Sequence, residues 1–333
     1  MKRIAVTGAG SWELSDGPDP VIGPSELLLA PKLVGLCATD LEILDGSMAY
    51  FREGRAVFPI TPGHEWVAEV VDPGEWADDF APGDLVVGEC SIGCGVCSLC
   101  GAGAYHLCPD RTETGIVHRD GGLAELMAFP AASTHRIPPG VDVQDAALIE
   151  PTAIAFRAVQ RLRVRSGSRV LVIGAGTIGY LVAAILTAVH AADVAVIDPD
   201  AGKLSRAAAV GAGAPGPGER FDRIVEASGA AAGVASAVER AAPGARLVVV
   251  GLTGQADVPV PIDQVVVGEL DVVGSIGSPG VWSDTIDLVA RGLVAPSALV
   301  TATMPMDRFA EAVRIAESRP PGVGKLLIQP SGA

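Results

Sequence analysis

The sequence predicts an α/β protein in which a doubly wound parallel sheet is joined to an irregular β-barrel. Two observations lead to this fold class. Apolar runs alternate with helical stretches from about residue 145 to residue 293. Before them, residues 1 to about 150 hold many short apolar runs separated by glycine and proline turns.

The alternating pattern is clearest around a glycine-rich turn. Val170 to Ile173 is a continuous apolar run, which favours a strand that is buried on both faces. After the turn, Tyr180 to Val189 is an unbroken run of good helix formers, and Val194 to Ile197 is a second buried strand that ends at Asp198. The order of strand, glycine turn, helix, strand and acid is typical of a dinucleotide-binding unit.

The glycines of this turn have the spacing GxGxxG, and each has a physical role. Gly174 permits the tight turn, Gly176 lets the backbone approach a pyrophosphate, and Gly179 lets the helix pack on the strand. A carboxylate at Asp198 can accept from both ribose hydroxyls of NAD and would repel a 2′-phosphate, and Lys203 is the only nearby cation. The candidate cofactor-binding residues are Gly174, Gly176, Thr177, Ile178, Gly179, Asp198 and Lys203.

The remaining elements define three segments. Strands are expected over Glu26–Leu29, Val67–Val71, Leu85–Val87 and Leu123–Phe129 in the first part, and over Arg223–Ala227, Arg246–Val250 and Leu270–Ser275 in the parallel sheet. A helix over Met306–Ser318 and a strand over Gly324–Gln329 form a tail that is too short to fold alone. We therefore expect a barrel domain at 1–152, a nucleotide-binding domain at 153–293, and a return to the first domain at 294–333.

Four cysteines lie close together in a glycine-rich loop, at Cys94, Cys97, Cys100 and Cys108. Four thiolates at this spacing can surround one Zn²⁺ as a tetrahedron and leave no open position, which predicts a structural zinc. Cys90 stands outside the spacing and is interpreted as a small buried hydrophobic residue.

A second possible metal set is dispersed along the chain: Cys37, then His64 and Glu65, then Glu150. One thiolate, one imidazole and one or two carboxylates suit a catalytic zinc that keeps a position for water or substrate. Each residue alone has a structural explanation, since Cys37 could be core, His64 could cap a turn and Glu150 could be a solvated helix end.

The motifs GLCATD, TPGHE, IEP, VIGAGTIG and GVGKLLI, with the four-cysteine loop, resemble the zinc-dependent medium-chain alcohol and polyol dehydrogenases along essentially the whole chain. The resemblance implies a GroES-like catalytic domain interrupted by a Rossmann domain. It places Cys37, His64 and Glu150 on the ligands of the catalytic zinc, and Glu65 on an acid that ligates the metal or lies just behind it. It also makes Thr39 the proton-relaying hydroxyl and Asp40 the partner of the histidine. Glu42 stands where many relatives have an outer relay histidine, which leaves the outer relay open.

Glutamate at position 150 is typical of the branch similar to sorbitol and glucose dehydrogenases, whereas simple alcohol dehydrogenases usually place cysteine there. The resemblance therefore implies an NAD-dependent enzyme with two zinc ions per chain, one catalytic and one structural. Its substrate would be a secondary alcohol or ketone of a polyol, sugar or (amino)cyclitol. The alternatives are a simple alcohol dehydrogenase or ketone reductase of the same family, a zinc-independent reductase of the same fold, and a non-catalytic nucleotide-binding relative.

Composition limits the possible partners. The chain has 333 residues and a net charge of −15 without a basic run, which argues against nucleic acid. No apolar window is long enough to cross a membrane, and the N-terminus lacks the apolar core of a signal peptide, so we expect a cytoplasmic protein without a membrane partner. The apolar run Leu270 to Ile276 is a candidate edge strand, which predicts a homodimer or homotetramer.

Overall fold

The structure is a computed structural model that describes residues 1–165, 167–190, 192–255 and 257–330. The chain forms two compact units. The first contains Met1–Glu150, Ser278–Ala290 and Ala295–Ala333, and the second contains Pro151–Gly277 and Arg291–Val294. Residues 278–290, which we assigned from the sequence to the nucleotide-binding segment, thus group with the first unit.

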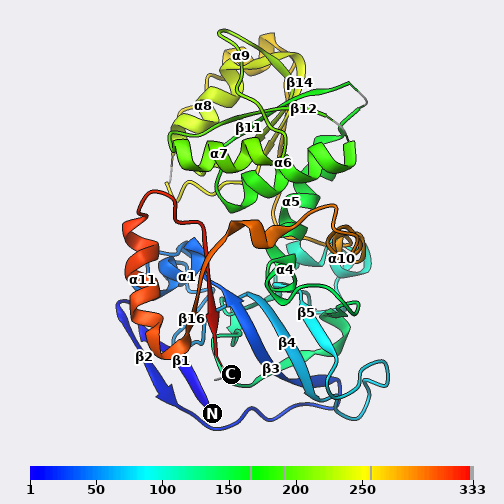
Figure 1. The fold of residues 1–333 in the computed structure, drawn as a ribbon, viewed down its shortest axis with the longest axis vertical. Coiled ribbons are helices and arrows are strands. Elements are labelled where there is room, and N and C mark those ends of the chain that lie inside the picture. The colour runs from blue at the N-terminus through cyan, green and yellow to red at the C-terminus, as the bar shows by residue number, and fades with distance from the viewer. Residues whose placement is uncertain (166, 191, 256, 331–333) are drawn as a thin grey trace. The chain divides into compact units, whose positions relative to one another are not determined.

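The first unit is built on a seven-stranded sheet with β3 (Glu26–Gly35) at its centre (Figure 1). On this strand pair β4 (Glu65–Asp72), β9 (Met127–Pro130) and β17 (Lys325–Gln329), all antiparallel to it. The sheet is completed by β5 (Leu85–Gly88), β10 (Thr134–Arg136) and β16 (Val300–Pro305). The C-terminal strands β16 and β17 are therefore part of the same sheet as the N-terminal strands.

Smaller elements surround this sheet. A hairpin joins β1 (Lys2–Gly8) to β2 (Ser11–Asp16), and a three-stranded sheet consists of β6 (Ser91–Ile92), β7 (Thr112–Thr114) and β8 (His118–Arg119). The helices of the unit are α1 (Ala38–Asp45), α2 (Ala49–Arg52), α3 (Ser98–Gly101), α4 (Val143–Ala147), α10 (Trp282–Ala290) and α11 (Phe309–Ser318).

The core of the first unit contains Trp66 packed edge-on against Phe129, with ring centroids 4.9 Å apart. Gly88 of the neighbouring strand leaves room for both rings, since a Cβ there would lie 2.3 Å from the Trp66 ring. The strand expected over Leu123–Phe129 starts only at Met127, because the backbone of Leu123 pairs instead with Pro62 and Ile4. Close packing of aromatic side chains thus fixes how these strands lie on one another.

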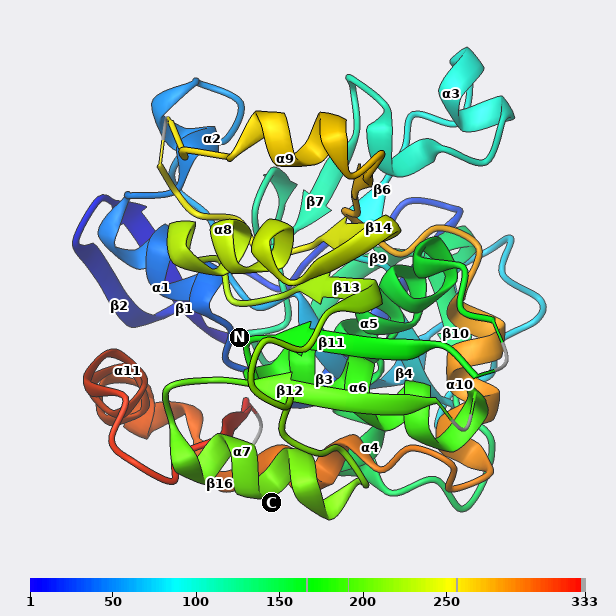
Figure 2. The same cartoon turned by 90° about the horizontal axis from the view of Figure 1, so that it is seen from above.

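The second unit contains a five-stranded parallel sheet in the order β12-β11-β13-β14-β15. Helices α6 and α7 cover one face and α8 and α9 cover the other, which is the doubly wound arrangement that the sequence predicts (Figure 2). The elements are α5 (Ile149–Leu162), β11 (Arg169–Ile173), α6 (Thr177–His190), β12 (Asp193–Ile197), α7 (Ala201–Ala209), β13 (Phe221–Glu226), α8 (Ala231–Glu239), β14 (Ala241–Val249), α9 (Ile262–Val267) and β15 (Asp271–Gly274).

The two edges of the parallel sheet differ. At β12 the backbone of Gly213 bridges to Ala195, so the chain itself covers that edge. At the other edge, β15 pairs only with β14 among the residues described, and its side chains are largely exposed. None of the helices in the described ranges has the length and apolarity needed to cross a bilayer.

Candidate metal centres and nucleotide site

Asp40 organises the two loops that hold the first candidate metal ligands. Its side chain is fully buried in the first turn of α1, where Oδ2 accepts from the N–H of Cys37 at 2.8 Å. Its other oxygen, Oδ1, accepts from the N–H of Gly63 at 3.1 Å. Gly63 has a φ of +100° and packs tightly on Val34, so the turn before His64 needs glycine there. One carboxylate thus fixes Cys37 and the turn that positions His64.

Cys37, His64 and Glu65 bring one ligand atom each into a group whose members all lie within 4.8 Å of one another. Nδ1 of His64 lies 3.6 Å from Oδ1 of Asp40, too far for a good hydrogen bond but close enough for an ion pair. Burial favours the neutral ring, but the charges of Asp40 and Cys37 outweigh it and raise the pKa of His64 well above its ordinary value. A thiol, an imidazole and a carboxylate in one small group fit Zn²⁺.

Glu65 has a buried partner for which the sequence analysis gave no role. Nζ of Lys325, on β17, lies 2.7 Å from Oε1 and 2.5 Å from Oε2 of Glu65. Gly35 makes room for the pair, since a Cβ there would lie 2.2 Å from Oε2. In the sequence, Lys325 belongs to the motif GVGKLLI. The feature that could have indicated its role is a lysine at the start of an apolar strand.

Glu150 is buried in the first turn of α5 and does not belong to the group formed by Cys37, His64 and Glu65. Burial is the main cause that raises the pKa of Glu150 to about 7, and the positive charge of His64 opposes the rise. The charge of Glu65 raises the pKa of Glu150 further, and that of Lys325 lowers it. Glu150 is therefore a nearby carboxyl whose charge is not fully compensated.

The remaining predicted residues of this site lie around it. Thr39 is half-buried in the first turn of α1, and Glu42, on the same helix, is exposed. Cys90, between β5 and β6, is partly buried and packs against the hydrophobic core of the unit. Burial of its sulfur raises the pKa of Cys90 well above its ordinary value, and the charges of His64 and Glu150 act on the same sulfur.

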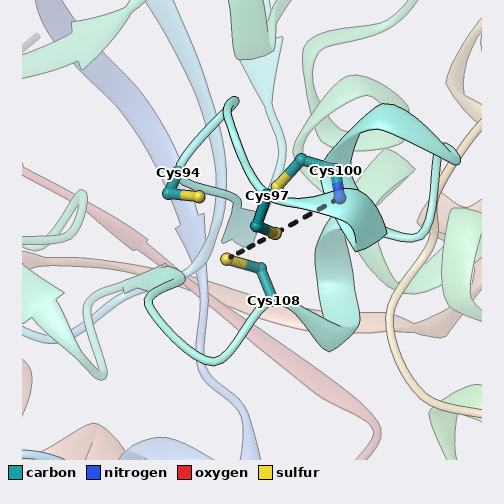
Figure 3. A group of neighbouring side chains, drawn as sticks. All are labelled: Cys94, Cys97, Cys100 and Cys108. Carbon is teal, nitrogen blue, oxygen red and sulfur yellow. Dashed lines mark hydrogen bonds between the residues drawn. The ribbon is translucent and has the colours of Figure 1, made fainter.

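The four-cysteine loop brings its sulfur atoms together (Figure 3). The Sγ atoms of Cys97 and Cys108 are 3.7 Å apart, which is too long for a disulfide. Tetrahedral Zn²⁺ with Zn–S bonds of about 2.3 Å requires sulfurs about 3.8 Å apart. All four cysteines are unpaired, and the ligand atoms of Cys94, Cys97, Cys100 and Cys108 lie within 4.8 Å of one another. The loop therefore fits one tetrahedral metal ion.

The glycine turn after β11 has the geometry expected for a nucleotide. Gly174 has a φ of +91°, and a Cβ at Gly179 would lie 1.8 Å from the carbonyl oxygen of Gly174, so the helix can approach the strand only without a side chain. Nothing lies within 4 Å of a Cβ at Gly176, so the backbone there is open to a ligand. Thr177 and Ile178 begin α6, whose N-terminus faces this turn.

Asp198 follows β12 at the carboxyl edge of the sheet. Its Oδ2 accepts from the N–H of Ala175 at 2.8 Å, which ties the acid to the glycine turn. Lys203 lies in the first turn of α7, which Asp200 caps. Sequence reasoning missed Glu226 at the end of β13: its carboxylate holds Ser228, whose backbone packs against Gly174. The signal available was an acid at the end of a buried strand.

The fold and the site define an oxidoreductase class with a doubly wound parallel sheet and two groups of residues that could hold a metal ion. Two family models match the chain: the alcohol dehydrogenase GroES-like domain over residues 23–139 and the zinc-binding dehydrogenase over residues 216–291. The chain belongs to the zinc-dependent medium-chain dehydrogenases, which are NAD(P)-dependent oxidoreductases that act on alcohols.

Individual relatives agree with this membership. The chain is 30% identical to the sorbitol dehydrogenase of Macaca fascicularis, over 93% of this chain and 90% of the relative. It is 34% identical to the L-threonine 3-dehydrogenase of Streptomyces avermitilis, over 80% and 81%. Among solved structures, an alcohol dehydrogenase of Escherichia coli complexed with NADH has a TM-score of 0.91 at 26% identity and covers 99% of both chains. A zinc-binding dehydrogenase of Sinorhizobium meliloti bound to NADP has a TM-score of 0.90 at 29% identity, with the same coverage.

Proposed function

We propose that the protein transfers hydride between NAD and a secondary alcohol or ketone of a polyol, a sugar or an (amino)cyclitol. The observation that carries the proposal is the group of Cys37, His64 and Glu65, with a further buried carboxyl at Glu150. An oxygen-rich donor set is harder than one with a second cysteine and tolerates a second substrate oxygen near the metal. A relative that acts on sorbitol, by its name, supports the same class of substrate.

Within this site we propose that Cys37, His64 and Glu150 hold the catalytic zinc, with Glu65 at or just behind it. Lys325 pairs directly with Glu65, whereas none of the described residues forms an ion pair with Glu150, so a divalent cation is the charge that would compensate Glu150. When bound, zinc supplies Lewis-acid chemistry that lowers the pKa of the substrate hydroxyl.

The residues of the chain have separate roles in this proposal. Thr39 accepts the proton of the substrate hydroxyl at its Oγ1 and passes its own outward. Asp40 keeps Cys37 and the His64 turn in place through its two backbone hydrogen bonds. The open backbone at Gly176 receives the pyrophosphate and so orients the nicotinamide for hydride transfer.

NAD is proposed as the preferred cofactor. The carboxylate of Asp198 is tied to the glycine turn and would repel a 2′-phosphate, while Lys203 is the nearest cation in sequence. Similar folds hold NADH in one structure and NADP in another, so the choice depends on such local residues. Comparable kcat/KM values with NAD and NADP would contradict the preference.

The proposal also includes a structural zinc in the four-cysteine loop, a homodimer or homotetramer, and a cytoplasmic location. The sulfur spacing supports the second metal. The six unpaired cysteines suit a compartment that keeps thiols reduced.

Metal analysis combined with a substrate panel tests the function. Wild-type protein should contain about two zinc per chain, with Cys100→Ser and Glu150→Ala each losing about one. Cys100→Ser should also melt at a lower temperature, whereas Glu150→Ala should lose turnover and still bind NADH. Full activity of Glu150→Ala, or faster oxidation of ethanol and benzyl alcohol than of any polyol, aldose or cyclitol, would rule the substrate class out. A single zinc in wild-type protein without activity would instead indicate a non-catalytic relative.

A further inference from the structure

Three polar side chains of the first unit meet beside the four-cysteine loop. Arg111 donates from Nε to Oε1 of Glu113 at 2.6 Å and from Nη2 to the hydroxyl of Tyr50 at 3.3 Å. Its third contact runs from Nη1 to the carbonyl of Cys108 at 3.2 Å. We call Tyr50, Arg111 and Glu113 the Arg111 cluster. The charged side chains of Arg111 and Glu113 are only 11% and 8% exposed. Burying such charges costs free energy, which their ion pair partly offsets.

The position of β7 brings this cluster next to the candidate catalytic site. Glu113 pairs with Ser91 across the sheet, and the following residue, Thr114, donates its N–H to the carbonyl of Cys90 at 2.9 Å. At the end of β7, a Cβ on Gly115 would lie 2.8 Å from the nitrogen of Gly63, directly before His64. The strand that holds Glu113 is thus fixed between Cys90 and the turn of His64.

Electrostatics link the same residues. Burial is the main cause that raises the pKa of Cys90, the charge of His64 lowers it, and the charges of Glu150 and Glu113 raise it further. The charges of the candidate metal ligands and of Glu113 thus act on the same thiol. Cys37 and Thr39 at the candidate metal site and Tyr50 of the Arg111 cluster are partly exposed, so both groups reach the surface of the unit through at least one side chain.

We propose that Glu113 is a specificity-determining residue of this site, where its carboxylate accepts a hydrogen bond from a second hydroxyl of the substrate. Arg111 is the positioning residue that holds the carboxylate in place. The inference rests on the proposed function and deepens it, because it assigns the preference for polyhydroxylated substrates to one side chain. A bound substrate displaces the water that hydrogen-bonds to the carboxylate of Glu113. A monohydroxy alcohol has no second hydroxyl to restore this hydrogen bond, so the site disfavours monohydroxy alcohols.

Because Arg111 also binds the carbonyl of Cys108, the cluster connects the four-cysteine loop to the substrate. Disorder in the four-cysteine loop should therefore loosen Arg111 and, through it, the carboxylate of Glu113. The loop then affects selectivity as well as stability.

The experiment compares butane-2,3-diol and D-sorbitol with butan-2-ol, using the zinc-loaded full chain. Glu113→Gln and Glu113→Leu should lower kcat/KM for the polyols at least about tenfold, mainly through KM, and leave butan-2-ol within about twofold. Arg111→Met should shift the same selectivity ratio, and Arg111→Lys should restore part of it. The matched controls are Arg308→Met and Glu311→Gln, which break an exposed ion pair at the N-terminus of α11 in the same unit.

The ratio of kcat/KM for the polyols to kcat/KM for butan-2-ol tests the proposed substrate class and the role of Glu113 separately. Wild-type preference for butan-2-ol would overturn the proposed substrate class, and an unchanged ratio in the Glu113 variants would overturn the role of Glu113. Equal losses on both kinds of substrate, or the same loss in the controls, would also overturn it, since a purely structural role lowers every activity alike. Melting temperature and zinc content measured alongside show whether each variant folds.

Discussion

At the scale of residues, the first unit combines several buried charges in a small volume. Asp40, Glu65, Glu150 and Lys325 are all nearly inaccessible to solvent, although only Glu65 and Lys325 form a direct ion pair among them. Buried charges cost free energy unless they are paired, hydrogen-bonded or bound to a metal. Their concentration next to Cys37 and His64 supports the proposed metal site there.

The Glu65–Lys325 pair gives a first prediction. Lys325→Met leaves the carboxylate of Glu65 buried without its partner, so we expect a loss of about 3 kcal/mol in the free energy of unfolding. Lys32→Met breaks the half-exposed pair with Glu69 and should cost less than about 1 kcal/mol. Urea unfolding of both variants tests this, and equal losses would show that burial does not strengthen the pair.

Glu226 gives a prediction about pH. Burial raises the pKa of Glu226 above its ordinary value of 4.5, although hydrogen bonds from Ser228 oppose the rise. The folded protein therefore keeps this proton at a pH where the unfolded chain has lost it, and stability falls as pH rises from 4.5 through the raised pKa.

Glu226→Gln removes this titration and keeps the shape of the side chain. The melting temperature of the variant relative to wild type should increase with pH across that window. Glu311→Gln, on the exposed face of α11, is the control and should show no such trend. A constant difference between Glu226→Gln and wild type would contradict the raised pKa.

At the scale of elements, glycines decide how closely strands, turns and helices approach. In the glycine turn, Gly179 is needed for packing, and Gly176 faces open space. The two glycines are only three residues apart, but their surroundings differ. Gly179 is needed for the packing of helix on strand, whereas we expect Gly176 to give the nucleotide access to the backbone.

Alanine substitutions should separate these purposes. Gly179→Ala places a methyl group on the carbonyl of Gly174 and should destabilise the second unit by at least about 1–3 kcal/mol. Gly176→Ala should leave the melting temperature nearly unchanged but weaken NADH binding, measured by fluorescence titration, because the methyl group occupies the space of the pyrophosphate. NADH binding by Gly176→Ala as tight as that of wild type would mean that the nucleotide does not approach there.

At the scale of the whole molecule, one edge of the parallel sheet, at β15, has no partner strand among the described residues. Gly213 covers the β12 edge, while β15 exposes Val272 and the following segment exposes Ile276, at 46% and 47%. Open apolar edges usually pair with another chain. A second copy related by a two-fold axis could pair β15 with itself and bury both residues.

Light scattering tests this assembly. Wild-type protein at micromolar concentration should have at least twice the mass of the chain, and Val272→Lys combined with Ile276→Lys should shift it towards the monomer. Val21→Lys changes an equally apolar but isolated exposed side chain of the first unit and should have no effect. A monomeric wild type would overturn the homo-oligomer.

The sequence by itself determined the fold class, because the apolar runs, the glycine spacing and the order of strand and helix are local patterns. The doubly wound sheet and the turn between β11 and α6 are confirmed by the structure. The four-cysteine group was predictable for the same reason, since its ligands lie within one loop.

Tertiary structure decided what depends on residues that are distant in the chain. Lys325 lies on β17 and Glu65 on β4, and both strands pair with β3. No local sequence pattern encodes the ion pair between them. The same holds for Glu113, whose place beside Cys90 follows from strand pairing. Which buried carboxyl has a paired lysine, and which does not, depends on contacts and charges that only the folded chain brings together.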